Sequence, residues 1–337
     1  MRYKTALILA VTGLVVALGV PATAAPGDTG DDGEGGSKSL VQQLEAASRG
    51  YLEAKEALAR STKRQSDLTA KLKELDAELG PRQEAFNEVV QQSYRTGRLG
   101  PMRALLQAST SAGFLDRAET LETVAVQERA VLNELLATRN GQQKAKIGID
   151  AAVRDQQKQV NLMAKRKVQA ENALKAANAN AGRDDPRPSD GGGSDRASAA
   201  PRSSDGSLPS QGCSRDDPTT GGCLTPRTLH ALQQAKSAGF TRFVKCFRQQ
   251  NSGEHPLGKA CDFAADKSGF GGVASGSSRT YGDRLANYFI NNASRLGVLY
   301  VIWFERIWLP SSGWKSYSRG NGDPSSDHTN HVHLSMR

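Results

Sequence analysis

Two short strings near the C-terminal end of the chain contain the residues best suited to chemistry. The first, HPLGKACD, begins at His255 and ends at Asp262, and the second contains His331 and His333. The chain has only five histidines, and three of them lie between residues 328 and 333. Two imidazoles and one carboxylate are a common ligand set for a hydrolytic zinc ion, whose fourth position is left to water. The sequence therefore predicts a metal site built from these two strings.

The spacing of these residues indicates the elements that position them. His331 and His333 are two residues apart, so on a strand both side chains leave the same face. Asp262 falls on a predicted strand, and His255 falls in the loop before it. We expect a mixed α+β domain with an antiparallel sheet. Its expected elements are helices at 225–239 and 283–296, short strands at 243–247, 260–264 and 332–335, and a strand or hairpin at 298–308.

Each of these residues taken alone is more often structural than functional. Asp262 in particular has an alternative role as a buried ion-pair partner of Arg248 or Lys245. The concentration of imidazoles beside one carboxylate nevertheless favours a metal site for the set as a whole.

The N-terminal segment predicts export. Residues 1–4 carry positive charge, residues 6–20 are almost wholly apolar, and residues 21–25 offer an Ala-x-Ala cleavage site. This is the pattern of a secretory signal peptide over residues 1–25. A single membrane anchor is the alternative, but the apolar run is short for a span. We expect a secreted protein, extracellular or associated with the cell wall, with no membrane span after signal removal.

All four cysteines lie in the C-terminal part of the chain. An even number of cysteines in an exported chain favours disulfide bonds, and four cysteines allow three pairings. We favour the pairing of Cys213 with Cys223, which closes a local loop, and of Cys246 with Cys261, which clamps two core segments.

The chain is basic, with a formal charge of +9 and a pI near 9.4. Such a charge fits attraction to an anionic surface, either cell-wall polymers or nucleic acid. The basic residues are scattered, however, and few aromatic residues accompany them over the first two hundred positions. This distribution favours a solvated helical surface with a mild basic bias, so we expect no nucleic-acid partner.

The composition divides the rest of the chain. Residues 26–37 are rich in Gly and Asp and are expected to be disordered, as are residues 178–212, a Gly/Ser/Asp/Pro-rich linker. Residues 213–337 have a globular mixture and the length of one ordinary domain.

Residues 38–177 are expected to form a long α-helical coiled-coil hairpin. Their composition favours helix, and Leu68, Leu72, Leu75 and Leu79 alternate four- and three-residue steps, as in a coiled-coil seam. Breaks rich in Gly, Pro, Ser and Thr at 95–101 and 109–113 end one helix and restart another. A kink is expected at Gly80-Pro81, and Gly141 and Gly148 weaken the second helix. Such a rod has no room for a catalytic pocket, so we expect it to act in spacing, docking to a protein partner or self-association.

Three strings of the hairpin carry a resemblance to known proteins. Tyr94–Gly97, Leu105–Ser109 and Phe114–Arg117 are similar to segments of the N-terminal coiled coils of secreted peptidoglycan hydrolases and division-associated wall proteins. In those families the hairpin docks or restrains a C-terminal catalytic domain.

The C-terminal part carries a second resemblance. The pattern H-x-x-G-x-A-x-D that ends at Asp262, followed by H-x-H, resembles the hedgehog/DD-peptidase fold of zinc D-alanyl-D-alanine carboxypeptidases and murein peptidases. A poorly characterised domain of secreted actinobacterial and fungal proteins is similar in the HPLGxACD string. The resemblance implies His255, Asp262 and His333 as zinc ligands, with His331 in the role of the first His of H-x-H.

The implied reaction is metal-assisted peptide hydrolysis, which needs a base to accept the proton of water. In the carboxypeptidase branch an acid lies three residues before the last ligand, where this chain has Asn330. His331 is a candidate base in its place, and Asp327 or His328 could reach the site from the preceding loop.

Substrate-binding residues are also expected. Arg248 and Arg306 are candidates for binding a peptide carboxylate through the guanidinium fork, and Trp308 is a candidate for lining the groove, although a core position is an equal alternative for it.

Three functions are compatible with these features. The first is a secreted zinc-dependent metallopeptidase that hydrolyses peptide bonds of peptidoglycan stem peptides or cross-links. The second is a non-catalytic, metal-retaining wall-binding or regulatory protein with a coiled-coil docking arm. The third is an extracytoplasmic spacer whose disulfide-stapled domain is only a cap.

Overall fold

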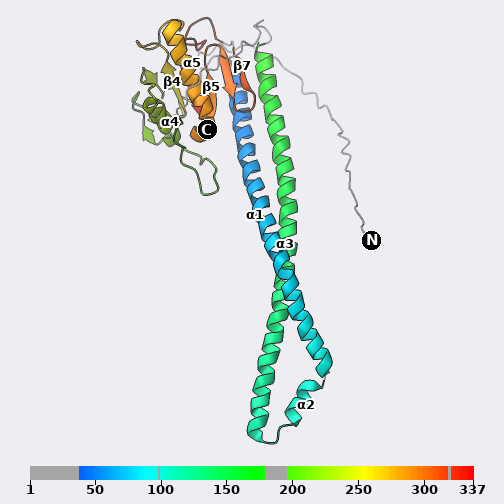
Figure 1. Cartoon of the computed structure of the whole chain (residues 1–337). Helices are drawn as coiled ribbons and strands as arrows, with labels where there is room; N and C mark the ends of the chain where they lie inside the picture. Colours follow the sequence, from blue (N-terminus) through cyan, green and yellow to red (C-terminus); the bar gives the residue numbers. More distant parts are fainter. Residues whose placement is uncertain (1–37, 98, 179–195, 318–319) are drawn as a thin grey trace.

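The computed structural model describes residues 38–97, 99–178, 196–317 and 320–337, which form a long helical hairpin and a C-terminal α+β domain (Figure 1). The expected signal peptide at 1–25 and the expected disordered segment at 26–37 lie outside the described residues, as do residues 179–195 of the expected linker. Among the described helices, none combines the length and the apolar character that a membrane span requires.

The hairpin contains three helices, and its chain breaks fall where the sequence predicts them. These are α1 (Lys38–Thr96), the short α2 (Gly100–Leu106) and α3 (Ser111–Asn178). At 1.5 Å per residue, α1 and α3 are about 90 and 100 Å long. Figure 1 shows them side by side near the domain, crossing farther out and then separated by α2. Helix α1 continues through Pro81 as a single helix.

Two glycines of α3 have a packing role in the hairpin seam. A Cβ atom on Gly141 would meet a methyl group of Leu75 at 3.1 Å, and one on Gly148 would meet a methyl group of Leu68 at 2.8 Å. The missing side chains therefore let the two seam leucines of α1 lie close against α3. Packing offsets the low helix propensity of these glycines.

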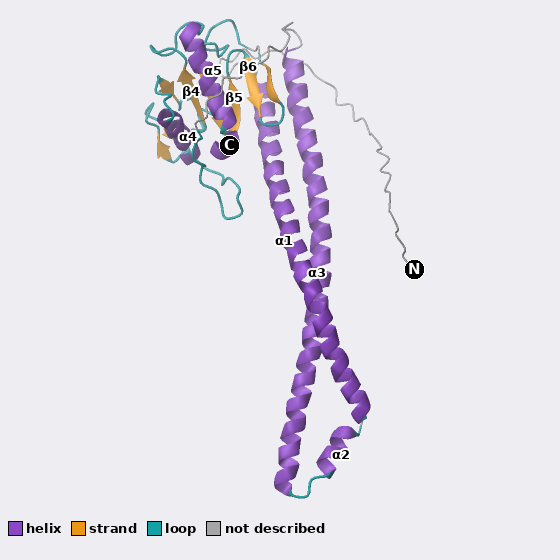
Figure 2. Ribbon diagram, in the orientation of Figure 1, coloured by secondary structure: helices purple, strands orange, loops and turns teal. Residues whose placement is uncertain are grey.

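The C-terminal domain is built on a six-stranded antiparallel sheet with the strand order β3-β4-β8-β5-β6-β7 (Figure 2). The α+β class expected from the sequence is confirmed. The strands of this sheet are β3 (Val244–Lys245), β4 (Ala260–Ala264), β5 (Val298–Ile302), β6 (Arg306–Leu309), β7 (Gly313–Ser316) and β8 (His331–Met336). The remaining elements are the pair β1 (Arg215–Asp216) and β2 (Cys223–Leu224), and the helices α4 (Pro226–Ser237), α5 (Gly276–Asn291) and α6 (Ala293–Leu296).

The two faces of the sheet are covered by different elements. Residues directly opposite one another on neighbouring strands share a face. One such row joins Cys261, Leu334, Val301 and Trp308, and it packs into a core with α4 and α5. The other face carries a row of Asp262, His333, Ile302 and Ile307.

The base of the hairpin, residues 38–56 of α1 and 170–178 of α3, covers part of this second face. Leu44 and Leu174 share a buried cluster with Tyr300 and Ile302 of β5. The Ser48 hydroxyl donates a hydrogen bond of 2.7 Å to the carbonyl oxygen of Leu299. The sheet face that carries Asp262 and His333 is thus shared between these polar residues and the hairpin base.

Both expected disulfides are present. Cys213 is bonded to Cys223, and Cys246 is bonded to Cys261. The second bond links the segment after β3 to β4. Of the three possible pairings, the favoured one is confirmed, and the disulfides are compatible with an exported protein.

Two boundaries differ from the sequence-based expectation. Residues 196–212, placed in the linker, lie against the domain, because the backbone N–H of Ala197 donates to Asn292 and both Ala197 and Ala200 are buried. Helix α5 begins at Gly276, ahead of the expected start at 283, within a Gly/Ser-rich stretch whose composition favours a loop. Strand β7 was not predicted.

Candidate metal centre

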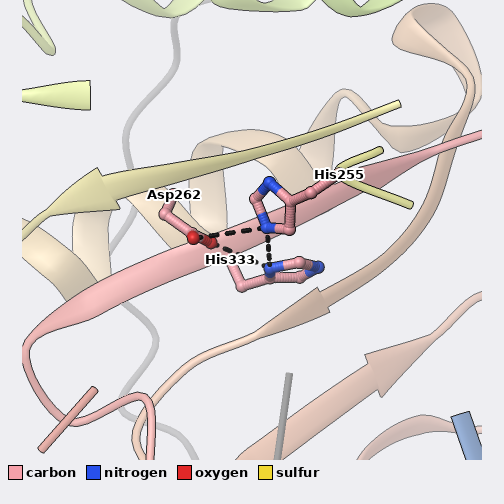
Figure 3. A group of neighbouring side chains, drawn as sticks. All are labelled: His255, Asp262 and His333. Atoms are coloured by element: carbon pink, nitrogen blue, oxygen red, sulfur yellow. Dashed lines mark hydrogen bonds and ion pairs between the residues drawn. The ribbon is translucent and has the colours of Figure 1, made fainter. Parts of the chain in front are cut away.

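Three buried side chains from the predicted strings converge on one point. They are His255, Asp262 and His333, and Figure 3 shows their polar atoms turned toward one another. His255 Nε2 lies 3.2 Å from Asp262 Oδ2 and 3.3 Å from His333 Nδ1. His333 Nδ1 lies 2.9 Å from Asp262 Oδ1. The two strings, about seventy residues apart in the chain, thus form a single site.

Strand register explains how Asp262 meets His333. Strands β4 and β8 are antiparallel, and Asp262 lies directly opposite His333. Directly opposite side chains leave the sheet on the same face within about 5.5 Å of each other at Cβ. His331, two residues earlier on β8, leaves the same face.

The turn before β4 brings in His255. Gly258 has a φ of +65°, and a Cβ there would lie 2.6 Å from the carbonyl oxygen of Cys223. Only glycine tolerates both the backbone conformation and the close approach. The glycine of the H-x-x-G string therefore lets the chain fold tightly over β2 and places His255 above β4.

The ligand imidazoles are oriented by their second nitrogen atoms. His255 Nδ1 hydrogen-bonds to the carbonyl oxygen of Cys246, which requires Nδ1 to carry the proton and leaves a lone pair on Nε2. His333 Nε2 lies 2.8 Å from the Ser335 hydroxyl, and the Tyr300 ring stacks on His333 with a centroid distance of 5.7 Å. Such outer contacts are typical of metal-ligating histidines.

The electrostatic setting holds the charge states that metal ligation needs. Burial by itself would raise the pKa of Asp262, but the neighbouring His255, His331 and Arg248 outweigh it and hold the pKa well below its usual range. Burial lowers the pKa of His333 to about 4, although the hydrogen bond to Asp262 opposes this shift. The site therefore contains a carboxylate and a neutral imidazole near pH 7.

The spacing of the donor atoms fits a tetrahedral metal. Bonds of about 2.0–2.1 Å to a tetrahedral zinc ion place any two ligand atoms about 3.3 Å apart. The three observed separations lie between 2.9 and 3.3 Å. A buried His/Asp/His group of this kind can hold a metal ion, and its nitrogen and oxygen donors suit zinc.

His331 presents a third imidazole to the centre. Its Nδ1 lies 2.7 Å from Asn330 Oδ1, while the Asn330 amide nitrogen donates to the Gly271 carbonyl oxygen and the Ser325 hydroxyl. The amide orientation requires His331 Nδ1 to be the donor, so Nε2 carries a lone pair. That Nε2 is buried, has no hydrogen-bond partner among the described residues and lies 3.5 Å from Asp262 Oδ1.

A pocket of about 290 Å³ leads to the centre. Arg248 lines it, as predicted for a substrate-binding residue, and also pairs with Asp262 Oδ2. Lys245 adds a second cation. The other lining residues are Asp262, Phe270, Asn321, Asp323, Ser325, Ser326 and His331.

Three predicted site residues are not brought to the pocket. Trp308 lies on the opposite face of the sheet and packs against the helical core. Arg306, two residues away on the same strand, shares that face, and its guanidinium lies 4.8 Å from the centre of the Trp314 ring. Asp327 lies in the loop before β8, where its carboxylate accepts a hydrogen bond of 3.4 Å from the Gly322 N–H. Side chains alternate between the two sheet faces along β6, and this alternation places Arg306 and Trp308 away from the pocket. The residue types alone do not reveal which face each side chain takes.

Sequence reasoning missed three contributors to the site. Tyr300, Ser335 and Glu254 surround the ligands, and Glu254 receives a salt bridge of 2.6 Å from Arg49 of the hairpin base. Period-two spacing from His333 could have indicated Ser335. The other two depend on contacts between distant segments, which no local pattern reports.

The fold and the centre together define a class, an α+β domain with a buried His/Asp/His group that could hold a metal ion. Residues 220–332 are similar to the family described as "VldE, C-terminal domain". This segment is about a third of the chain; it includes His255, Asp262 and His331 and ends one residue before His333. No curated protein and no solved structure matches the chain.

Proposed function

We propose that the C-terminal domain is a zinc-dependent peptidase of the hedgehog/DD-peptidase type that hydrolyses peptide bonds in peptidoglycan. The single observation that carries this proposal is the buried convergence of His255, Asp262 and His333 beside a pocket. A zinc ion held by these residues supplies Lewis-acid activation of water and of a peptide carbonyl group.

The chain's own residues supply the remaining roles. His331 Nε2, with its lone pair directed to the centre, accepts the proton of the attacking water. Asn330 accepts the hydrogen bond from Nδ1 of His331 and so keeps Nε2 of that imidazole unprotonated. In this proposal His331 takes the role of the acid that the carboxypeptidase branch has at the position of Asn330. His331 is therefore the base in this proposal. Asp327, held in the loop, has no role in it.

Arg248 and Lys245 favour a substrate with a negative charge. Both line the pocket beside the carboxylates of Asp262 and Asp323, and Arg248, which already pairs with Asp262, can donate a further hydrogen bond to a substrate carboxylate. Stem peptides of peptidoglycan carry carboxylates, and the expected export signal and the formal charge of +9 support a partner in the cell wall.

Asn330 also favours a second candidate function. An amide cannot accept a proton, so a domain without another base would hold a metal and bind wall peptides without cutting them. In this alternative the hairpin is the docking arm of a non-catalytic wall-binding protein.

Metal content and turnover of the full chain test both functions. We expect stoichiometric zinc by elemental analysis, loss of zinc in His255→Ala, and retention of zinc in the control His230→Ala, since His230 lies apart from the cluster. Purified peptidoglycan fragments should be cleaved by the parent chain. They should be cleaved far more slowly by His331→Ala although that variant retains zinc. Zinc binding without cleavage would favour the wall-binding protein, and absence of zinc would overturn both candidates.

A further inference from the structure

The distal half of the hairpin lacks a buried core. Among the described residues, none between Leu75 of α1 and Leu135 of α3 is buried. The base, by contrast, buries Leu40, Leu44 and Leu174 against the domain. In the distal half the two long helices also separate beyond their crossing, with α2 between them (Figure 1).

Large apolar side chains gather on this uncovered part. We define the tip as residues 90–126. Tyr94 is 88% exposed, Leu106 is 77% exposed, and Leu99 is 69% exposed. Single exposed apolar residues are normal on a protein surface, but a concentration of them marks an interaction site. The other exposed large apolar residues of the tip are Val90, Met102, Phe114, Leu115, Val124 and Val126.

The charges around the tip are segregated along the hairpin. Arg95 and Arg103 are exposed at the end of α1 and in α2, and Arg117 holds α2 to α3 through a hydrogen bond of 2.9 Å to the carbonyl oxygen of Ala104. Immediately behind this basic band lies an acidic band on both long helices. Its exposed members are Glu84, Glu88, Glu119 and Glu122, and Glu128 is half-buried, while one exposed residue of opposite sign lies in each band, Asp116 in the basic band and Arg129 in the acidic band.

Two such hairpins are complementary when they overlap in opposite directions. The basic band of each copy then faces the acidic band of the other, and the exposed apolar residues, which lie within both bands, meet along the overlap. The distance from Glu84 to Arg95 is about 16 Å along the helix, so an overlap of a few helical turns aligns both bands at once. A surface that is complementary to itself is what a two-fold dimer requires.

We propose that the hairpin tip associates with the tip of a second copy of this chain, antiparallel and two-fold symmetric. An anionic membrane surface would attract the basic band, but it would repel the acidic band beside it, so it accounts for only half of the pattern. A different protein would need to reproduce both bands, which a second copy already carries.

The oligomeric state of the full chain tests this proposal. Sedimentation velocity over a range of concentrations should give a concentration-dependent dimer. Leu106→Ser should raise the dissociation constant at least tenfold. The control Ile147→Ser, at a residue of α3 that is 56% exposed outside the tip, should leave it unchanged. A monomer at all concentrations, or equal effects of the two substitutions, would overturn the proposal.

Charge-reversal variants distinguish self-association of the tip from binding of the tip to another partner. Arg95→Glu/Arg103→Glu and Glu84→Arg/Glu88→Arg chains should each dimerise at least tenfold more weakly than the parent, and their mixture should recover the parent's affinity. Circular dichroism should report unchanged helix content, because all four positions are exposed. Mixed chains that fail to associate, or a monomer that binds vesicles of anionic lipid, would contradict the antiparallel dimer.

Discussion

At its base the hairpin packs against the C-terminal domain and forms hydrogen bonds and ion pairs with it. At its tip the same two helices leave apolar side chains in contact with solvent. The base shares a buried cluster with β5 and β6, and Arg337 of the domain pairs with Glu56 of α1. The tip has no buried residue among those the structure describes. A two-helix rod cannot cover its own apolar residues on every side, so each end needs a further surface. The domain supplies that surface at the base.

The largest expected difference between the two ends concerns a core residue. Leu44 is 1% exposed, so Leu44→Ala should lower the free energy of unfolding by about 2–5 kcal/mol through lost burial and a cavity. Leu106→Ala at the tip should change the stability of the monomer by less than about 0.5 kcal/mol. Urea denaturation followed by tryptophan fluorescence and circular dichroism, at low protein concentration, measures both. Equal losses would remove the distinction between base and tip.

Removal of a bound metal should also destabilise the hairpin base and leave the tip unaffected. A ligand at a hundred times its dissociation constant stabilises the folded state by about 2.7 kcal/mol, and chelation removes that contribution. Amide hydrogen exchange should therefore accelerate in β4 and β8, which carry two ligands, and in the hairpin base, which packs against Tyr300. Exchange at the tip should not change. Uniform acceleration along the hairpin would mean that the metal centre and the base are not coupled locally.

The ion pair at the base should contribute more than an ion pair in mid-hairpin. Arg49→Ala removes the salt bridge of 2.6 Å to Glu254, whose side chain is 1% exposed, and should cost about 1–3 kcal/mol. Arg82 pairs with Glu78 and Glu134 at the surface, so Arg82→Ala should cost less than about 1 kcal/mol. Thermal denaturation of the two variants gives the comparison, and a larger loss for Arg82→Ala would reverse it.

The last expected difference is a pH dependence of stability that arises at the hairpin base. Burial, and then the charge of Glu254, raise the pKa of Glu45 from its ordinary value of 4.5 to about 7, against Arg49, the Tyr300 hydroxyl and Lys259. The folded chain then binds a proton that the unfolded chain has lost, so stability falls as the pH rises from about 4.5 to about 7.

Glu45→Gln should remove this dependence and stabilise the chain at pH 8 relative to pH 5, by at most about 3 kcal/mol, since the pKa rises from 4.5 to about 7 and one pKa unit corresponds to 1.36 kcal/mol. Denaturation midpoints of the parent and the variant at pH 5 and pH 8 test it. Parallel profiles would show that Glu45 does not titrate within the interface.

The contrast between the two ends also marks what sequence patterns can predict. The H-x-H spacing, the glycine turn and the coiled-coil seam are local, so the ligands, the tight turn and the hairpin could be predicted. Contacts between segments more than two hundred residues apart, such as Ser48 with Leu299, leave no periodic signal. The covering of the sheet by the hairpin therefore emerges only in the folded chain.

The sequence also could not predict on which face of the sheet a strand residue lies. Arg306 and Trp308 have side chains that could bind a substrate. The pairing of Ile302 with Ile307 nevertheless places them on the sheet face that α4 and α5 cover. A one-residue shift of β6 would have reversed this result, because strand side chains alternate. The register of an interior strand depends on its neighbours and its turns as well as on its own residues.

The disulfide between Cys246 and Cys261 imposes an order of events on the maturation of this protein. The Cys246 carbonyl oxygen orients His255, and Cys261 is the neighbour of Asp262, so one covalent bond links the supports of two ligands. Such bonds do not persist in a reducing cytoplasm. If the chain is exported, as its N-terminal segment predicts, this bond forms in the oxidising compartment, so the backbone supports of both candidate ligands are completed only there.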